Sequence, residues 1–159
     1  MSKWIKAETE KPKIEEIWIE HIVDDNPDLS FLESEVVDGK VISDAYSQAD
    51  YDEDPKTIEK YIEEDTKRLN DYGNTWVQWG IRAVAEVSYP IASQPGSRRL
   101  ERFTSSGIWG IDSDSDGAGI AAEEESQLDD LKSHLEQFGV DVSDFDSKCS
   151  GEVKEVAER

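Results

Sequence analysis

The strongest constraint on the fold is the alternation of apolar and polar residues in the segment 76–89, WVQWGIRAVAEVSY. Every odd-numbered residue from Val77 to Tyr89 is apolar, whereas the even-numbered residues include Gln78, Arg82, Glu86 and Ser88. Successive side chains of a β-strand point to opposite faces of its sheet. The segment therefore predicts a long strand with one buried face and one wetter face.

Three further segments have the pattern of strands. Residues 93–97, SQPGS, form a turn segment, and a second strand is expected from residue 98 to about residue 111. Together with the segment above, it predicts a long antiparallel hairpin over about 75–111. Residues 14–23, IEEIWIEHIV, predict a strand, and residues 36–42, VVDGKVI, predict a short hairpin that turns at Asp-Gly.

Two segments have the 3.6-residue apolar period of an amphipathic helix. The first begins at Pro55 and ends before Gly73, and the second ends before Gly139. Their apolar stripes are Ile58, Ile62, Leu69 and Tyr72 in the first helix, and Leu128, Leu131, Leu135 and Phe138 in the second. This order of elements predicts an α+β domain in which both helices pack on one face of an antiparallel sheet.

The length of 159 residues favours one domain with a sizeable core. Residues 1–13 are polar and are expected to form a flexible arm before a single domain over 14–140. Residues 141–159 are charged and contain few large apolar side chains, so they are expected to form an acidic mobile tail.

The formal net charge of −21 restricts the kinds of partner. Such a field repels nucleic acids and acidic membranes and attracts basic surfaces, so the expected partner is a basic protein rather than nucleic acid or a membrane. The first residues lack the apolar core of a signal peptide, and Cys149 is the single cysteine, which favours the cytoplasm. Adaptation to solubility or to high salt would explain the same charge.

Acidic residues cluster in two regions. One is an acidic loop expected over residues 43–54 together with the helix after it, and the other is in the second helix. On a helix, residues three and four apart lie about 5–6 Å from one another, which is of the order of the phosphate spacing along DNA. These clusters are the candidate partner-binding surface: Asp50, Asp52, Glu53, Asp54, Glu59, Glu63 and Glu64 in the first, and Glu123, Glu124, Asp129 and Asp130 in the second.

The segment DSDSDG, residues 112–117, matches the letter pattern of a calcium-binding EF-hand loop. Asp112, Asp114 and Asp116 would be ligands, and Glu123 would be the bidentate ligand at the twelfth position. An EF-hand loop joins two helices, however, whereas a strand is expected before this segment. The alternative is that these residues cap the helix that follows. Both interpretations remain open, and no other cofactor is expected.

Motifs of catalysis are absent from the sequence. His21 and His134 lack the spacing of metal ligands, and no phosphate-binding loop or hydrolase elbow occurs. The chain is therefore expected to be non-enzymatic. A local group of arginines, Arg82, Arg98, Arg99 and Arg102, is expected to pair with Glu86 and Glu101 on and beside the long hairpin.

Residues 106–111, SGIWGI, are followed by acidic and serine residues and by a leucine-spaced helix that ends in FGV. This combination resembles a family of uncharacterised small acidic proteins of bacterial phages and other mobile elements. The resemblance covers roughly residues 76–140 and is most specific over 107–114. It implies an accessory protein that acts against host defence or host machinery, and it transfers no catalytic residue.

Together these features predict a DNA mimic that binds and inhibits a basic, nucleic-acid-binding host protein, such as a CRISPR effector or a restriction enzyme. The alternatives are a small calcium-binding module built on DSDSDG and an acidic structural domain without a dedicated partner. The sequence leaves the oligomeric state open.

Overall fold

The computed structural model describes residues 11–157, which fold into two compact units. Of the described residues, unit 1 contains 11–24 and 78–157, and unit 2 is the continuous segment Asp25–Val77. The α+β class is confirmed, but the prediction of a single domain over 14–140 is wrong, because each unit has its own hydrophobic core. Most of the predicted N-terminal arm, residues 1–10, lies outside the described residues.

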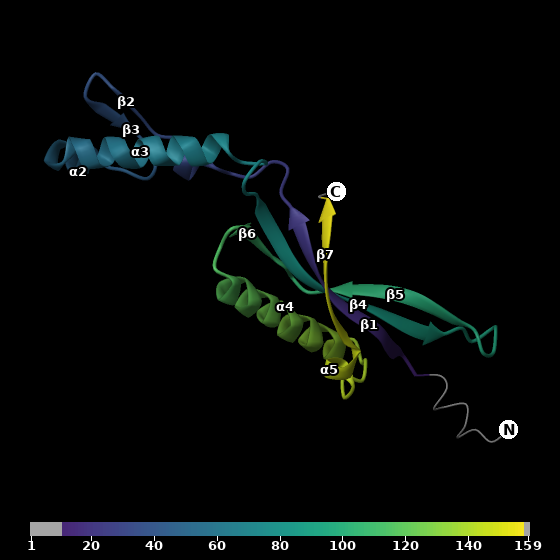
Figure 1. Ribbon diagram of the computed structural model, residues 1–159. Helices are drawn as coiled ribbons and strands as arrows, with labels where there is room; N and C mark the ends of the chain where they lie inside the picture. The colour runs from purple at the N-terminus through teal and green to yellow at the C-terminus, as the bar shows by residue number, and fades with distance from the viewer. Residues whose placement is uncertain (1–10, 158–159) are drawn as a thin grey trace. The chain divides into compact units, whose positions relative to one another are not determined.

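A five-stranded, mostly antiparallel sheet forms unit 1 (Figure 1). The main path of the sheet runs β5-β4-β1-β7, and β6 also pairs with β4. The strands are β1 (Lys13–Val23), β4 (Gln78–Pro90), β5 (Arg98–Thr104), β6 (Ile108–Asp112) and β7 (Cys149–Ala157).

The predicted long hairpin is present as β4 and the two short strands that follow it. Strand β4 pairs with β1 along one edge, and β5 and β6 share its other edge. The returning strand expected over residues 98–111 is thus interrupted. Gly107 lies in the interruption with a φ of +83°, a conformation that glycine adopts without steric cost.

Helix α4 (Gly117–Gln137) lies along one face of this sheet (Figure 1). The odd-numbered residues of β4, including Ile81 and Val87, pack there with Ile17 of β1 against Leu131 and Leu135 of the helix. These five side chains are almost completely buried. The alternation in the sequence therefore identified the buried face of β4 correctly.

A buried polar contact fixes α4 against the sheet. The side chain of Gln127 accepts hydrogen bonds from the Ser105 hydroxyl, at 2.7 Å, and from the Gly107 backbone N–H, at 2.9 Å. Ser105 also accepts a hydrogen bond from the backbone N–H of Ala83, at 2.9 Å. The Gly107 N–H lies between β5 and β6, where the strand ladder is interrupted. Gln127 of α4 satisfies this group in place of a neighbouring strand.

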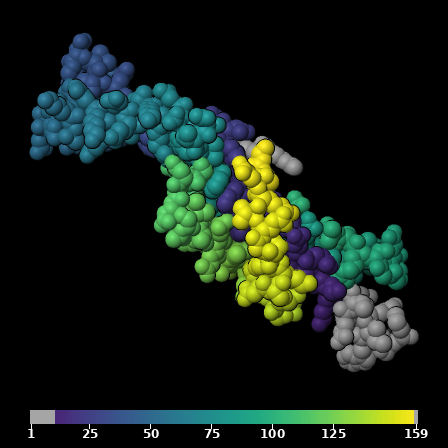
Figure 2. Space-filling model, viewed as in Figure 1, coloured from purple at the N-terminus to yellow at the C-terminus, as the bar shows by residue number. Residues whose placement is uncertain are grey.

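The prediction of an acidic mobile tail over 141–159 is wrong for most of its length. Residues Phe145–Lys148 form helix α5, and β7 adds to the edge of the sheet in parallel with β1. Val140 and Phe145 are buried and anchor this segment in the core. The polar composition of residues 149–157 does not indicate a strand, because an edge strand pairs through its backbone. Most side chains of β7 are exposed, and the segment is yellow in Figure 2.

Unit 2 contains a short 3-10 helix, η1 (Ser30–Leu32), a hairpin of β2 (Glu35–Val37) and β3 (Lys40–Ile42), and helices α2 (Gln48–Glu53) and α3 (Pro55–Asn70). The hairpin turns at Asp38 and Gly39, which both have positive φ, as its Asp-Gly sequence predicts. The core of the unit joins Leu29, Leu32 and Trp76 to Leu69 and Tyr72.

Helix α3 has the predicted beginning at Pro55 and the predicted apolar stripe, but it belongs to unit 2. The prediction that it packs beside the second helix on the central sheet is therefore wrong. The segment 43–54, expected to be an acidic loop, contains helix α2. Within residues 11–157, no helix is both long and apolar enough to cross a membrane.

Candidate functional site

The first acidic cluster lies on α2, on α3 and at their junction, and we call it the α2–α3 acidic surface. All of its members are exposed: Asp50, Asp52, Glu53, Asp54, Glu59, Glu63 and Glu64. Short-range hydrogen bonds position the two helices. Ser47 caps α2 by accepting from the Asp50 N–H at 3.1 Å, and Asp54 caps α3 by accepting from the Thr57 N–H at 3.3 Å.

A tyrosine connects the loop before α2 to α3. The Tyr46 hydroxyl donates a hydrogen bond to the Asp65 carboxylate at 2.7 Å. Burial, together with this hydrogen bond and the charge of Asp65, raises the pKa of Tyr46 to about 12, so the hydroxyl keeps its proton. This hydrogen bond holds the loop that precedes α2 close to α3.

The charge of the α2–α3 acidic surface is largely uncompensated. Unit 2 contains fifteen acidic and five basic residues, a net charge of −10 over residues 25–77. In the part of the chain that the structure describes, none of the seven carboxylates forms an ion pair with lysine or arginine. The contacts they make are hydrogen bonds, such as the one that the Tyr51 hydroxyl donates to Glu59 at 3.0 Å.

The acidic residues of α4 are exposed or half-buried, and two of them contact the sheet. Asp129 is exposed and Glu123 is half-buried. Glu124 lies 2.9 Å from His21 of β1, and Asp130 accepts the Ser106 backbone N–H at 2.7 Å. That backbone hydrogen bond lowers the pKa of Asp130. Glu124 and Asp130 therefore connect α4 to the sheet and contribute little to an open acidic surface.

The DSDSDG segment forms the start of α4. The helix begins at Gly117, the sixth position of the motif, and Asp116 caps it by accepting from the Ala118 N–H at 3.3 Å. Asp112 belongs to β6 and accepts a hydrogen bond from Gln78 at 3.2 Å. The capping interpretation is thus confirmed for Asp116.

The proposed calcium ligands are not brought together in this arrangement. Positions six to twelve of the motif are helical, so at 1.5 Å per residue Glu123 lies about 9 Å along the helix from Gly117. Among residues 11–157, no three histidine, cysteine, aspartate or glutamate side chains form a group that could hold a metal ion. Calcium binding by Asp112, Asp114, Asp116 and Glu123 remains a prediction.

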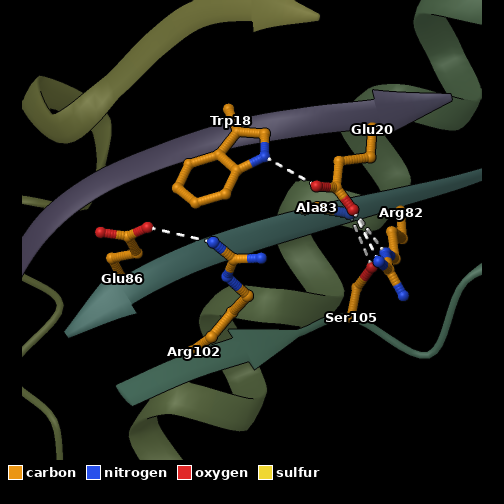
Figure 3. A network of polar contacts seen from close by, with 7 residues as sticks. All are labelled: Trp18, Glu20, Arg82, Ala83, Glu86, Arg102 and Ser105. Atoms are coloured by element: carbon orange, nitrogen blue, oxygen red, sulfur yellow. Dashed lines mark hydrogen bonds and ion pairs between the residues drawn. The ribbon is translucent and has the colours of Figure 1, made fainter. Parts of the chain in front are cut away.

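The face of the sheet opposite α4 has a polar network that the sequence analysis missed (Figure 3). The Glu20 side chain is 6% exposed, and its two oxygens accept from different donors. Oε2 accepts from the Trp18 indole at 3.1 Å, and Oε1 accepts from Nε and Nη2 of Arg82 at 2.8 and 2.7 Å. Burial raises the pKa of Glu20, but these hydrogen bonds and the nearby arginines outweigh it and lower the pKa below 4.5.

Two of the four arginines, Arg99 and Arg102, pair with the glutamates that the sequence predicts. Arg102 of β5 pairs across the strands with Glu86 of β4 at 3.2 Å, as predicted, and Arg99 pairs with Glu101 of its own strand. Arg82 pairs instead with Glu20, which is 62 residues away in sequence. No local sequence pattern indicates this contact, apart from the fact that both residues lie at even positions of alternating strands.

A pocket of about 250 Å³ opens beside this network on the same face. Its polar wall contains Glu20, Arg82 and Arg102, and Ile22 and Val156 form an apolar wall. Trp109 of β6, which is 50% exposed, also lines it. The six-membered ring of Trp109 lies directly over Gly80, where a Cβ atom would be only 2.7 Å from the ring.

Comparisons of the chain with models of protein families, with curated proteins and with solved structures find no match.

Proposed function

We propose that this chain is a non-enzymatic accessory protein of a phage or mobile element that inhibits a nucleic-acid-binding host protein by mimicking DNA. The observation that carries the proposal is the α2–α3 acidic surface, with its seven exposed carboxylates outside any ion pair in the described chain. The host cytoplasm is the compartment where such a partner would be met.

Two capped helices hold the negative charges of this surface in fixed positions. Glu59 and Glu63 are four residues apart on α3, a spacing of about 5–6 Å between neighbouring side chains. The caps at Ser47 and Asp54 fix the helices that present them. Charges on an ordered scaffold lose less conformational freedom on binding than charges on a disordered chain. A groove lined by lysine and arginine to bind phosphates would accept this surface in place of DNA.

The experiment is a displacement of DNA from its binding proteins. A bacterial extract is loaded on immobilised DNA, and the column is washed with the wild-type protein at low salt. Proteins released by the wild type are identified, purified and tested for competition between this chain and a labelled DNA duplex. The proposal expects at least one released protein whose DNA is displaced in proportion to the concentration of the chain.

Two triple variants make the test specific for the acidic surface. The first replaces Glu59, Glu63 and Glu64 with glutamine. The matched control carries three glutamine substitutions in unit 1, at the exposed positions Glu125, Glu136 and Glu152. Both variants lose three negative charges, so a general effect of net charge is the same in each.

The first variant is expected to compete about tenfold less well than the wild type, and the control is expected to stay close to it. Competition should also weaken steeply as salt screens the charges. Equal loss in both variants, competition that is insensitive to salt, or release of no protein at all would contradict mimicry by this surface.

A further inference from the structure

The pocket on the open face of the sheet has a chemistry opposite to that of the α2–α3 acidic surface. Three ionisable side chains line the pocket: Glu20, Arg82 and Arg102. The two cations outnumber the one anion, in a protein whose net charge is −21. An anion in the pocket therefore meets less repulsion than the net charge of the chain suggests.

The acidic group in the pocket does not face a ligand as a free carboxylate. Both oxygens of Glu20 accept hydrogen bonds, one from Trp18 and one from Arg82, and Arg82 also balances its charge. A guanidinium has five N–H donors. Arg82 uses its Nε and Nη2 groups on Glu20, and Arg102 reaches Glu86 through Nη2, so each keeps donors that can reach an anion.

Trp109 supplies a fixed aromatic surface to the same pocket. Its indole lies against the backbone of Gly80, and any larger residue at position 80 would displace it. Half of the residue remains exposed although it is held in place from below. Aromatic rings stack favourably in offset arrangements, by about 0.5–1.5 kcal/mol beyond the burial of area. The exposed indole can therefore receive a flat ring.

We propose that this pocket binds a small planar anion, a single ring that carries a carboxylate or a phosphate group. The ring packs against Trp109 and the apolar side chains of Ile22 and Val156, and the anionic group accepts hydrogen bonds from Arg82 and Arg102. The volume of about 250 Å³ fits one ring better than a larger ligand. The proposal does not depend on DNA mimicry, because it concerns unit 1 and a different ligand.

The test is a titration followed by NMR of the ¹⁵N-labelled full-length protein. The five tryptophans each give one indole N–H signal, and Trp109→Phe identifies the signal of Trp109 by its loss. The probes are benzoate, phenyl phosphate and benzamidine, which shares the ring of benzoate but is cationic. Benzoate and phenyl phosphate distinguish a ring that carries a carboxylate from a ring that carries a phosphate group.

The proposal expects a saturable shift of the Trp109 signal with benzoate or with phenyl phosphate below about 10 mM, and none with benzamidine. It is overturned if neither anion gives saturation, or if benzamidine gives the same shift. It is also overturned if the signal moves with protein concentration alone, because Trp109 would then be part of a contact between copies.

Two arginine variants separate the pocket from surface charge. Arg102→Gln is expected to weaken binding about tenfold, because a charge-assisted hydrogen bond to the anion is lost. Arg99→Gln is the matched control, since Arg99 lies three residues away on β5, has similar exposure and pairs with Glu101. An equal effect of both variants would contradict the proposed site even if an anion bound. The remaining amide signals show directly whether each variant keeps the fold.

Discussion

At the scale of single residues, the Glu20–Arg82 pair joins a buried carboxylate of β1 to β4. The Glu20 side chain is buried whereas the Arg82 side chain is 37% exposed, so the pairing mainly offsets the cost of removing the carboxylate from water. The loss of one partner is nevertheless costly, because the other then lacks a counter-charge. The carboxylate of Glu20 also organises Trp18, whose ring lies between the cations of Lys154 and Arg102, at 4.0 and 5.2 Å from its centroid.

The first prediction concerns pH and the variant Glu20→Gln. Because the pKa of Glu20 is lowered in the folded state, its ionised form adds stability above its ordinary value of 4.5. That contribution is lost as the pH falls through the lowered, folded-state value. The variant is therefore expected to be about 1–2 kcal/mol less stable than the wild type at neutral pH. The difference should begin to narrow below pH 4.5 and close once the pH has fallen through the folded-state pKa.

Urea unfolding of both proteins over a range of pH values measures this difference directly. Glu152→Gln, on an exposed position of β7, is the control and should match the wild type throughout. A gap between Glu20→Gln and the wild type that persisted undiminished in acid would show that the lost stability comes from packing and not from the charge.

At the scale of elements, the sequence predicted the structure best where side chains alternate or repeat with a clear period. Strands β1 and β4, the hairpin at Asp38 and Gly39, and helices α3 and α4 all follow from such patterns. Strand β7 does not, because its partner is the backbone of β1, and pairing of backbones leaves little trace in composition. Contacts such as Glu124 with His21, across 103 positions, have no local pattern either.

The second prediction tests whether the C-terminal segment is part of the fold. Phe145 is 3% exposed in the core, so Phe145→Ala is expected to cost about 3–5 kcal/mol. Val153→Ala, at an exposed position of β7, should cost less than about 1 kcal/mol. Chemical unfolding followed by circular dichroism measures both. Equal and negligible losses would restore the description of this segment as a mobile tail.

The third prediction concerns the start of α4. Because the DSDSDG segment is a strand end followed by a helix, the melting temperature in about 1 mM calcium should match that in the same concentration of magnesium. Asp116→Ala should lower stability by about 1 kcal/mol, with or without EDTA, through loss of the helix cap. A rise of several degrees specific to calcium, abolished by Glu123→Ala, would establish the metal loop instead.

At the scale of the whole molecule, the formal charge is −10 in unit 2 and −11 in unit 1, although unit 2 has half as many residues. Unit 2 therefore carries about twice the negative charge per residue. The sequence could show the total, but it could not show which carboxylates are exposed and which, like Glu124 and Asp130, are used within the fold. That distinction leaves the α2–α3 acidic surface as the stronger of the two predicted binding surfaces.

The fourth prediction follows from the self-repulsion of this charge. Raising the salt from about 0.01 M to 0.15 M shortens the screening length from about 30 Å to about 8 Å. The repulsion that opposes the compact state then weakens. The melting temperature is expected to rise by about 3 °C or more. Choline chloride should act like sodium chloride if screening is the cause. A fall in melting temperature would show that attractive ion pairs dominate.

The position of β1 at the centre of its sheet has a consequence for synthesis. The ribosome makes this strand before both of its neighbours, and the Ser150 hydroxyl donates a hydrogen bond to the Ile17 carbonyl across 133 positions. Unit 2 is one continuous segment and can fold while the nascent chain is still growing. Strand β1 stays unpaired until β4 and then β7 have been synthesised. The charges of Glu16 and Glu20 make the unpaired β1 less prone to pair with another nascent chain.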